Sequence, residues 1–146
     1  MQIEIKLDDS FREPKVLICA AAVTEEIQDI LDRLSEQTPR IITGLREEKL
    51  EVLEPEKLIR IYASGGKVLA VTEQGEYILR QRLYELEKQL DGRKFVRISN
   101  SEMINLSQVR TFGLSFTGTV CVRLSNGDVT YVSRRCVPKI KKILGI

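Results

Sequence analysis

From about residue 45 onward, the sequence is a succession of short stretches in which apolar and polar residues alternate, separated by turn signals. Alternation of this length, bounded by Gly, Pro, Asn or Asp, predicts short strands of a sandwich or barrel. The stretches are KLEVLEP, KLIRIYA, KVLAVT, EYILR, KFVRIS, MINLSQVRTF, TVCVRL and DVTYVS. Asn126-Gly127, between the last two, predicts a hairpin with a type I′ turn. We therefore expect a mainly β, sandwich-like domain over residues 45–146.

Two short helices are expected within this domain. RLYELEKQL has its leucines on one side and is stopped by Asp91-Gly92. CVPKIKKILGI places Pro138 where a first helical turn tolerates it. The expected class is thus mainly β, and α+β overall.

Residues 1–44 have a different pattern, which predicts a small β-β-α segment. QIEIKL alternates as a half-buried strand does, and KVLICAAAV is typical of a more buried strand. Thr24 can cap a following helix that is closed by Pro39. One apolar stripe runs along this helix, formed by Ile27, Ile30, Leu31 and Leu34.

The composition argues against most catalytic and metal sites. The chain has no histidine, which removes Ser-His, Cys-His and His-metal arrangements. Its three cysteines, Cys19, Cys121 and Cys136, are far apart, which argues against a disulfide framework or a zinc ribbon. Buried or half-buried thiols are the preferred interpretation, and a redox role of Cys136 is the alternative. We therefore expect that the protein is not an enzyme and that it binds no cofactor or metal.

No stretch is apolar and long enough for a membrane helix, and the acidic start is unlike a signal peptide. We therefore expect a cytoplasmic protein without membrane insertion. Residues 93–146 contain ten basic and two acidic residues, a net charge of +8, whereas residues 1–92 carry −6. This asymmetry favours a polyanion-binding module. The alternative is that the two parts pack together and neutralise each other.

Two polar segments are candidates for anion contacts. The first is the interruption ISNS, residues 98–101, between two strands; the second is Ser133–Arg135, directly before the last helix. Free N–H groups at a helix start and two arginines would suit a phosphate. The alternatives are an Asn100 that only bonds its own turn, and arginines that pair with glutamates.

From about Lys49 to its end, roughly two thirds of the chain, the sequence resembles the LytTR DNA-binding domain. The resemblance is carried by IRIYASGGKVLAVTEQGEYILRQRLYELEKQLDGRKFVRISNSEMINLSQVRTF and SNGDVTYVSRRCVPKIKKIL. It implies an elongated β-β-β sandwich of about ten strands that contacts duplex DNA through loops in the major groove. The whole chain resembles stand-alone LytTR regulators, whose short first segment is unlike a phosphorylated receiver domain.

The resemblance also implies roles for individual residues. Asn100 and Arg135 match the positions expected to contact base edges. Where some members carry a larger base-contacting residue this chain has Gly66, so we expect no base contact from that loop and at most a phosphate contact from Lys67. The residues expected to hold or position phosphates are Gly66, Lys67, Arg97, Ser99, Ser101, Ser133, Arg134 and Lys139.

The expected function is a response-regulator-like transcriptional regulator that binds paired half-sites of promoter DNA as a homodimer. Residues 1–44 would mediate dimerisation or regulation. A small-ligand or protein-binding regulatory domain without DNA binding is the alternative. RNA binding is a third possibility, which the 5% aromatic content disfavours because single-stranded RNA recognition depends on stacking.

Overall fold

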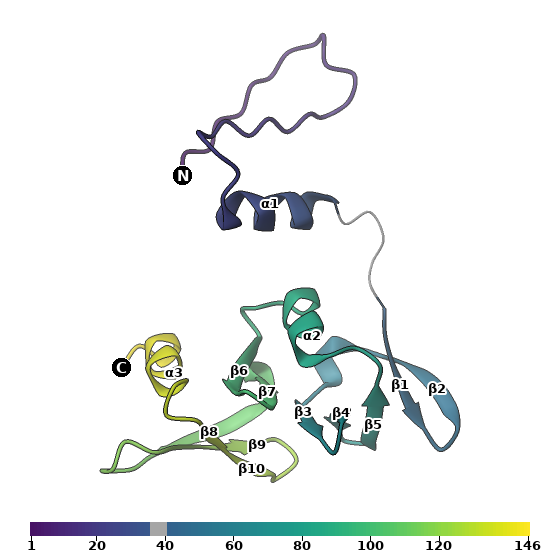
Figure 1. Ribbon diagram of the computed structural model, residues 1–146, viewed down its shortest axis with the longest axis vertical. Coiled ribbons are helices and arrows are strands. Elements are labelled where there is room, and N and C mark those ends of the chain that lie inside the picture. The colour runs from purple at the N-terminus through teal and green to yellow at the C-terminus, as the bar shows by residue number, and fades with distance from the viewer. Residues whose placement is uncertain (36–40) are drawn as a thin grey trace. The chain divides into compact units, whose positions relative to one another are not determined.

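The structure of the chain, a computed structural model, describes residues 1–35 and 41–146 (Figure 1). It divides into two compact units, Met1–Pro39 and Arg40–Ile146. Its elements are α1 (Glu25–Ser35), β1 (Ile42–Arg46), β2 (Lys49–Leu53), η1 (Pro55–Lys57), β3 (Arg60–Ser64), β4 (Lys67–Thr72), β5 (Gly75–Leu79), α2 (Leu83–Gln89), β6 (Phe95–Ser99), β7 (Glu102–Asn105), η2 (Leu106–Gln108), β8 (Val109–Leu114), β9 (Val120–Leu124), β10 (Val129–Val132) and α3 (Val137–Leu144). Within the described ranges, no helix could span a membrane.

In the first unit, the predicted helix and its cap are confirmed. The N–H of Ile27 donates to Thr24 Oγ1 at 3.4 Å, and Glu25 and Glu26 occupy the first turn of α1. Acidic residues there interact favourably with the positive end of the helix dipole. The predicted closure at Pro39 lies outside the described residues.

The two strands predicted before α1 are wrong, because residues 1–24 form no strand. Ile3 and Ile5, the inward positions of the first predicted strand, are 86% and 83% exposed. Alternation describes only how side chains would be sorted between two faces. A strand also needs a neighbouring strand to bond its N–H and C=O groups, and residues 1–35 supply none.

The second unit contains ten strands, as expected, in two antiparallel sheets. Seven strands form one sheet in the order β2-β1-β5-β4-β3-β7-β6, and the order β10-β9-β8 forms the other. The strands predicted from KLEVLEP, KLIRIYA, KVLAVT, EYILR, KFVRIS, TVCVRL and DVTYVS are confirmed. The expected domain boundary at residue 44 falls inside β1, so the second unit includes residues before it.

The sequence pattern does not predict β1, because its stretch ITGLR carries a glycine in the middle. A Cβ at Gly44 would lie 2.6 Å from Tyr77 Cβ and 2.8 Å from Leu53 Cδ1. Those distances are too short for any larger residue, so close packing within the sheet requires glycine. The residue that weakens the strand pattern is therefore the one that lets the strand pack.

The stretch MINLSQVRTF was expected to be one strand, but it forms two strands in different sheets. η2 separates β7 from β8. Asn105, only 1% exposed, stabilises this break: its Nδ2 donates to Leu58 O at 2.8 Å, and its Oδ1 accepts from the N–H of Ser107 at 3.0 Å. A side chain that bonds the backbone two residues on favours a turn over a continued strand.

The β9–β10 hairpin is confirmed, but its turn is not type I′. Type I′ needs positive φ at both central residues, whereas here Gly127 has φ 92° and Asn126 is not in the left-handed region. The N–H of Gly127 donates to Leu124 O at 3.0 Å, and the N–H of Leu124 donates to Asp128 O at 2.9 Å. These bonds close a three-residue loop instead.

Two hydrophobic clusters stabilise the second unit. One packs α2 against the seven-stranded sheet and includes Leu83, Leu86 and Tyr77. The other joins β6 and β7 to the three-stranded sheet and α3, with Ile140 fully buried. Figure 1 shows α2 beside β6 and α3 beside the three-stranded sheet. Because both helices are packed by their buried faces, the segments that contact them are held in place.

Candidate nucleic-acid interface

Ser99–Ser101 form a tight turn between β6 and β7, where the register of the two strands shifts. The N–H of Ser101 donates to Ser99 Oγ at 3.2 Å, and the two serine hydroxyl oxygens lie 3.4 Å apart. Asn100, at the tip, is exposed. The serines therefore shape the turn, and the Asn100 amide lies exposed at its tip.

Backbone hydrogen bonds bring this turn beside both other predicted contact segments. The N–H of Ala63, at the end of β3, donates to Ser101 O at 2.8 Å. The N–H of Ser133 donates to Ile98 O at 2.7 Å. The loop after β3, the turn after β6 and the start of α3 thus meet on one side of the second unit, as expected for a shared binding surface.

The loop Ser64–Lys67 is a hairpin tip, as predicted. Ser64 pairs with Lys67 in the β3–β4 register, and Gly65 and Gly66 have φ of 59° and 77°. Two successive left-handed residues suit the right-handed twist of a hairpin and favour glycine. Gly66 offers backbone alone, and the exposed Lys67 supplies the positive charge of this loop.

Arg134 and Arg135 lie in a turn that leads into α3. The N–H of Cys136 donates to Ser133 O at 2.9 Å, and that of Val137 donates to the same oxygen at 3.1 Å. Both arginines are exposed, but Ser133 Oγ is buried and has no hydrogen-bond partner among the residues that the structure describes. The structure therefore presents the arginines to solvent and turns the predicted phosphate-binding hydroxyl of Ser133 away from it.

The two predicted base-contacting residues contact each other. Arg135 Nη2 donates a hydrogen bond to Asn100 Oδ1, across 35 residues of sequence. The alternative that the arginines pair with glutamates is not what the structure shows. Within the described ranges, no acidic side chain forms an ion pair with Lys67, Arg134, Arg135 or Lys139.

Arg97, expected to hold phosphate, is engaged inside the protein. Its Nε donates to Glu87 Oε2 at 3.1 Å. Its Nη1 donates to Ser99 O at 3.1 Å and to Asn100 O at 2.6 Å. Only 21% of its side chain is exposed. The sequence shows Arg97 as a basic residue beside the turn but does not predict its ion pair with Glu87. Glu87 lies on α2, ten residues earlier, and no local sequence pattern connects the two positions.

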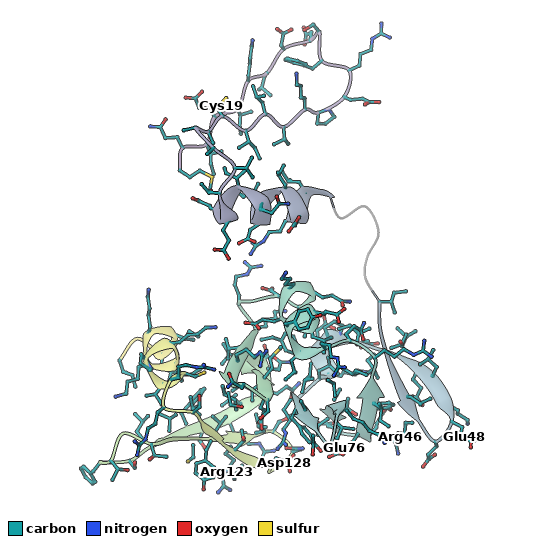
Figure 2. The ribbon with its side chains drawn as sticks, viewed as in Figure 1. Cys19, Arg46, Glu48, Glu76, Arg123 and Asp128 are labelled. Atoms are coloured by element: carbon teal, nitrogen blue, oxygen red, sulfur yellow. The ribbon has the colours of Figure 1, made fainter. Side chains whose placement is uncertain are left out.

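A second polar cluster, which sequence reasoning missed, connects the two sheets behind this turn. Arg60 Nε lies 3.8 Å from Glu102 Oε2, and Arg60 Nη1 lies 3.9 Å from Asp128 Oδ2. The guanidinium stacks 4.4 Å from the centroid of the Tyr62 ring, whose hydroxyl donates to Glu76 Oε1 at 3.0 Å. Figure 2 labels Asp128 and Glu76, the outer acids of this cluster.

Burial changes the titration of this cluster. It raises the pKa of Glu102, and Arg60 and a hydrogen bond from Thr130 oppose that shift. The pKa of Tyr62 is also raised, first by burial and then by its bond to Glu76. Glu102 belongs to β7 and Thr130 to β10, so the carboxyl links the seven-stranded sheet to the three-stranded one.

The cysteines and acids show no metal centre among the described residues. No three His, Cys, Asp or Glu side chains are placed together there to hold an ion. Cys121 and Cys136 are half-buried free thiols, as expected, but Cys19 is exposed. The expectation for Cys19 is wrong because the strand that would have buried it does not form.

Comparison with known protein families decides the fold family. The model of the family described as LytTr DNA-binding domain matches residues 48–145, which include every element from β2 to α3. The chain belongs to the LytTr DNA-binding domain family. The match contains all three polar segments that meet at the turn. The predicted family and its mainly β fold are thus confirmed.

Similar proteins agree with this assignment. Proteins of Staphylococcus aureus strains NCTC 8325 / PS 47 and COL, both described as uncharacterized HTH-type transcriptional regulators, are each 27% identical over 147 residues. Each alignment covers 100% of this chain and 99% of the relative. The LytTr DNA-binding domain of a Bacillus cereus protein described as a methyl-accepting/DNA response regulator superposes with a TM-score of 0.69. It is 20% identical and covers 73% of this chain and 97% of that domain, which shows the shared fold.

Proposed function

We propose that this LytTr protein is a sequence-specific regulator of transcription that binds duplex DNA through loops in the major groove. The observation that carries the proposal is the meeting of three polar segments, joined by the Ala63–Ser101 and Ser133–Ile98 backbone bonds. These segments come from β3–β4, β6–β7 and the start of α3. Lys67, Arg134 and Arg135 form no ion pair with an acidic side chain in the described chain and are available for phosphates.

Asn100 and Arg135 would contact the bases. Arginine can donate to both O6 and N7 of guanine, and asparagine can pair with N6 and N7 of adenine. In the free protein Arg135 donates to Asn100 Oδ1, the atom that would accept from adenine N6. The hydrogen bond between the two side chains would therefore orient both at the surface, and it would be exchanged for hydrogen bonds to bases on DNA binding.

The phosphate contacts would come from the surrounding positive charges and backbone. Lys67 lies on the β3–β4 tip beside Gly66, and Arg134 and Lys139 flank the start of α3. Ser99 and Ser101 contribute chiefly by shaping the turn, since their hydroxyls bond within it. Such contacts fix orientation on the duplex without distinguishing sequences.

The first unit would mediate dimerisation on paired half-sites. Many apolar side chains among its described residues are exposed; these include Ile3, Ile5, Leu7, Leu17, Val23 and Leu34. Exposed apolar area of this extent marks an association site. A second copy, with a two-fold axis, would cover the same residues on both chains.

Selection of bound sequences from random duplex DNA tests this function directly. The selected site and a scrambled site are then titrated over a series of salt concentrations. With about five phosphate contacts, the logarithm of affinity should fall with log salt at a slope near −4 to −5. Lys67→Ala should lower that slope by about one on both DNAs. Failure to enrich any sequence, or a flat salt response, would contradict the proposal.

A further inference from the structure

The guanidinium of Arg97 forms the centre of a hydrogen-bond network that ends at the proposed base-contacting turn. One edge donates to Glu87 Oε2, and the Nη1 nitrogen donates to the carbonyls of Ser99 and Asn100. An arginine fork is planar, so fixing one edge on a carboxylate also fixes the direction of the other nitrogens. Through this geometry, Glu87 sets where the two carbonyls are held.

These carbonyls lie at the end of the β6–β7 ladder, directly after its irregularity. The β6–β7 register shifts between Arg97 and Ser99, and Asn100 lies in the turn itself. On its other side, the turn is held by the bond from the Ala63 N–H to Ser101 O. The turn is therefore held from both sides: by β3 and by Arg97.

The carboxylate that orients Arg97 belongs to a helix that is itself firmly packed. Leu83 and Leu86 of α2 are buried in the core of the seven-stranded sheet, at 6% and 0% exposure. Glu87 follows them on α2 and reaches Arg97 on β6. The helix carries none of the expected DNA contacts, yet it affects the turn, because Glu87 orients Arg97 and Arg97 holds the turn carbonyls.

We infer that Arg97 is a positioning residue, anchored by Glu87, that fixes the Ser99–Ser101 turn so that Asn100 meets a base edge. This inference rests on the proposed function, and it replaces the phosphate contact that the sequence suggests for Arg97. Base contacts demand closer placement than phosphate contacts, because bidentate bonds depend on direction. Specific binding should therefore depend on Arg97 and Glu87, whereas binding to arbitrary DNA should not.

Glu87→Gln separates the two roles, because they predict opposite effects. If Arg97 contacts phosphate, removal of a competing carboxylate frees its charge and strengthens binding to every DNA. If Arg97 positions the turn, the loss of a charge-assisted hydrogen bond weakens binding to the selected site alone. Glu73→Gln is the matched control, since Glu73 is exposed at the opposite end of β4 from the Gly65-Gly66 tip. Arg97→Lys is the second variant, which keeps the charge and loses the fork.

The test titrates the full chain and these variants against the selected site and its scrambled form. Glu87→Gln and Arg97→Lys should each weaken specific binding by roughly 10-fold, with scrambled DNA bound as before and the salt slope unchanged. Glu73→Gln should behave as wild type. Tighter binding of Glu87→Gln to both DNAs, or unchanged specific binding by both variants, overturns the inference.

A measurement on the free protein separates this inference from the proposed function. The Ala63 amide, which donates to Ser101 O, reports whether the turn is held, and the Leu124 amide in the β9–β10 hairpin is the reference. Hydrogen exchange at Ala63 should accelerate by roughly 10-fold in Glu87→Gln and Arg97→Lys, with Leu124 unchanged. Unchanged exchange at Ala63 overturns the inference. If the wild type binds no duplex, the proposed function fails, and exchange alone decides whether Arg97 holds the turn.

Discussion

The first six-residue alternating stretch and strand β3 have nearly the same pattern, but only β3 is a strand. In QIEIKL, Ile3 and Ile5 are 86% and 83% exposed, whereas Ile61 of β3 is fully buried. The difference lies in their surroundings. β3 is hydrogen-bonded to β4 on one side and to β7 on the other, whereas residues 1–24 contain no strand. Alternation thus becomes a strand only where neighbours satisfy its backbone.

The two units also differ in net charge. Residues 1–39 carry a net charge of −5 and residues 40–146 carry +7. The acids of the first unit that the structure describes are exposed, whereas the second unit buries Glu102 among ionic partners. The second unit has a core that fixes polar groups in place, and the first presents its apolar and acidic groups to solvent.

Two isoleucine substitutions, one in each unit, should show the largest difference in their effect on stability. Ile61→Ala removes a fully buried side chain and should lower the free energy of unfolding by about 2–5 kcal/mol. Ile5→Ala, in the matching pattern of the first unit, should change it by less than about 0.5 kcal/mol. Urea unfolding at low protein concentration measures both. Equal losses in the two variants would show that residues 1–24 share a cooperative core with the sheets.

Removal of residues 1–39 should abolish dimers and weaken binding to paired half-sites. Cutting after residue 39 keeps β1 intact, whereas a cut at residue 44 would divide it. A monomer can contact only one half-site at a time, so its affinity for the paired site should be about 100-fold or more lower. Its affinity for a single half-site should be unchanged. Light scattering and titration on both DNAs measure this effect.

A point substitution checks the same role within the full chain. Leu34→Asp charges an exposed apolar position of α1 and should shift the chain toward monomer if that face is covered by a second copy. Undiminished affinity of the truncated chain for the paired site would remove the first unit from assembly.

The sequence predicts the second unit well because most of its strands have a repeating pattern and a turn signal beside them. The pattern fails at Gly44 and at Asn105, where one contact between distant parts of the chain decides the local structure. In the first unit it fails in the opposite direction. Ile3 and Ile5 satisfy the local rule, but residues 1–24 contain no strand to pair with them.

For the candidate site, the sequence identifies residue types and segments but not their partners. The prediction that Asn100 and Arg135 belong to one site agrees with their hydrogen bond in the free protein. The assignment of Arg97 to phosphate could not anticipate Glu87, which reaches it from α2. Ser133 Oγ points into the protein for a similar reason, because its backbone is bonded to β6. Such pairings depend on how helices and strands pack.

Arg135→Lys should sharpen the distinction between base contact and charge in the second unit. Replacement of Asn100 or Arg135 by Ala should cost about 1–3 kcal/mol on the selected site and relax preference at particular bases. Lysine keeps the charge of Arg135 but loses its planar fork, so a base contact should lose nearly as much as with alanine. Arg134→Lys, one residue earlier, is the control for a phosphate contact.

The combined Asn100→Ala and Arg135→Ala variant should lose less than the two single losses added together. Their hydrogen bond in the free protein means that removing one side chain also disturbs the other. Titrations on the selected and scrambled sites decide. If Arg135→Lys retains affinity and sequence preference, Arg135 neutralises phosphate, and Asn100 alone remains a candidate for base contact.

The smallest expected effect concerns pH, and it contrasts an acid in each unit. Burial raises the pKa of Glu102, so the folded state holds the proton more tightly than the unfolded state. The stability this provides is present below the unfolded pKa, about 4.3, and is lost as pH rises through the folded pKa. Glu102→Gln cannot titrate, so the free energy of unfolding of the wild type, relative to that variant, should fall as pH rises through this window.

Asp8 supplies the control, because its pKa is shifted the other way at an exposed position. The pKa of Asp8 is lowered chiefly by a hydrogen bond from the backbone of Ser10 and also by one from its side chain. Asp8→Asn should leave the pH dependence of unfolding of the second unit unchanged, since Asp8 belongs to the first unit. Urea unfolding of the wild type and both variants from about pH 4 to pH 7 makes the comparison. If the wild type instead gains stability relative to Glu102→Gln as pH rises, the attraction of Arg60 outweighs burial, and the link between the two sheets is an ion pair that strengthens when Glu102 ionises.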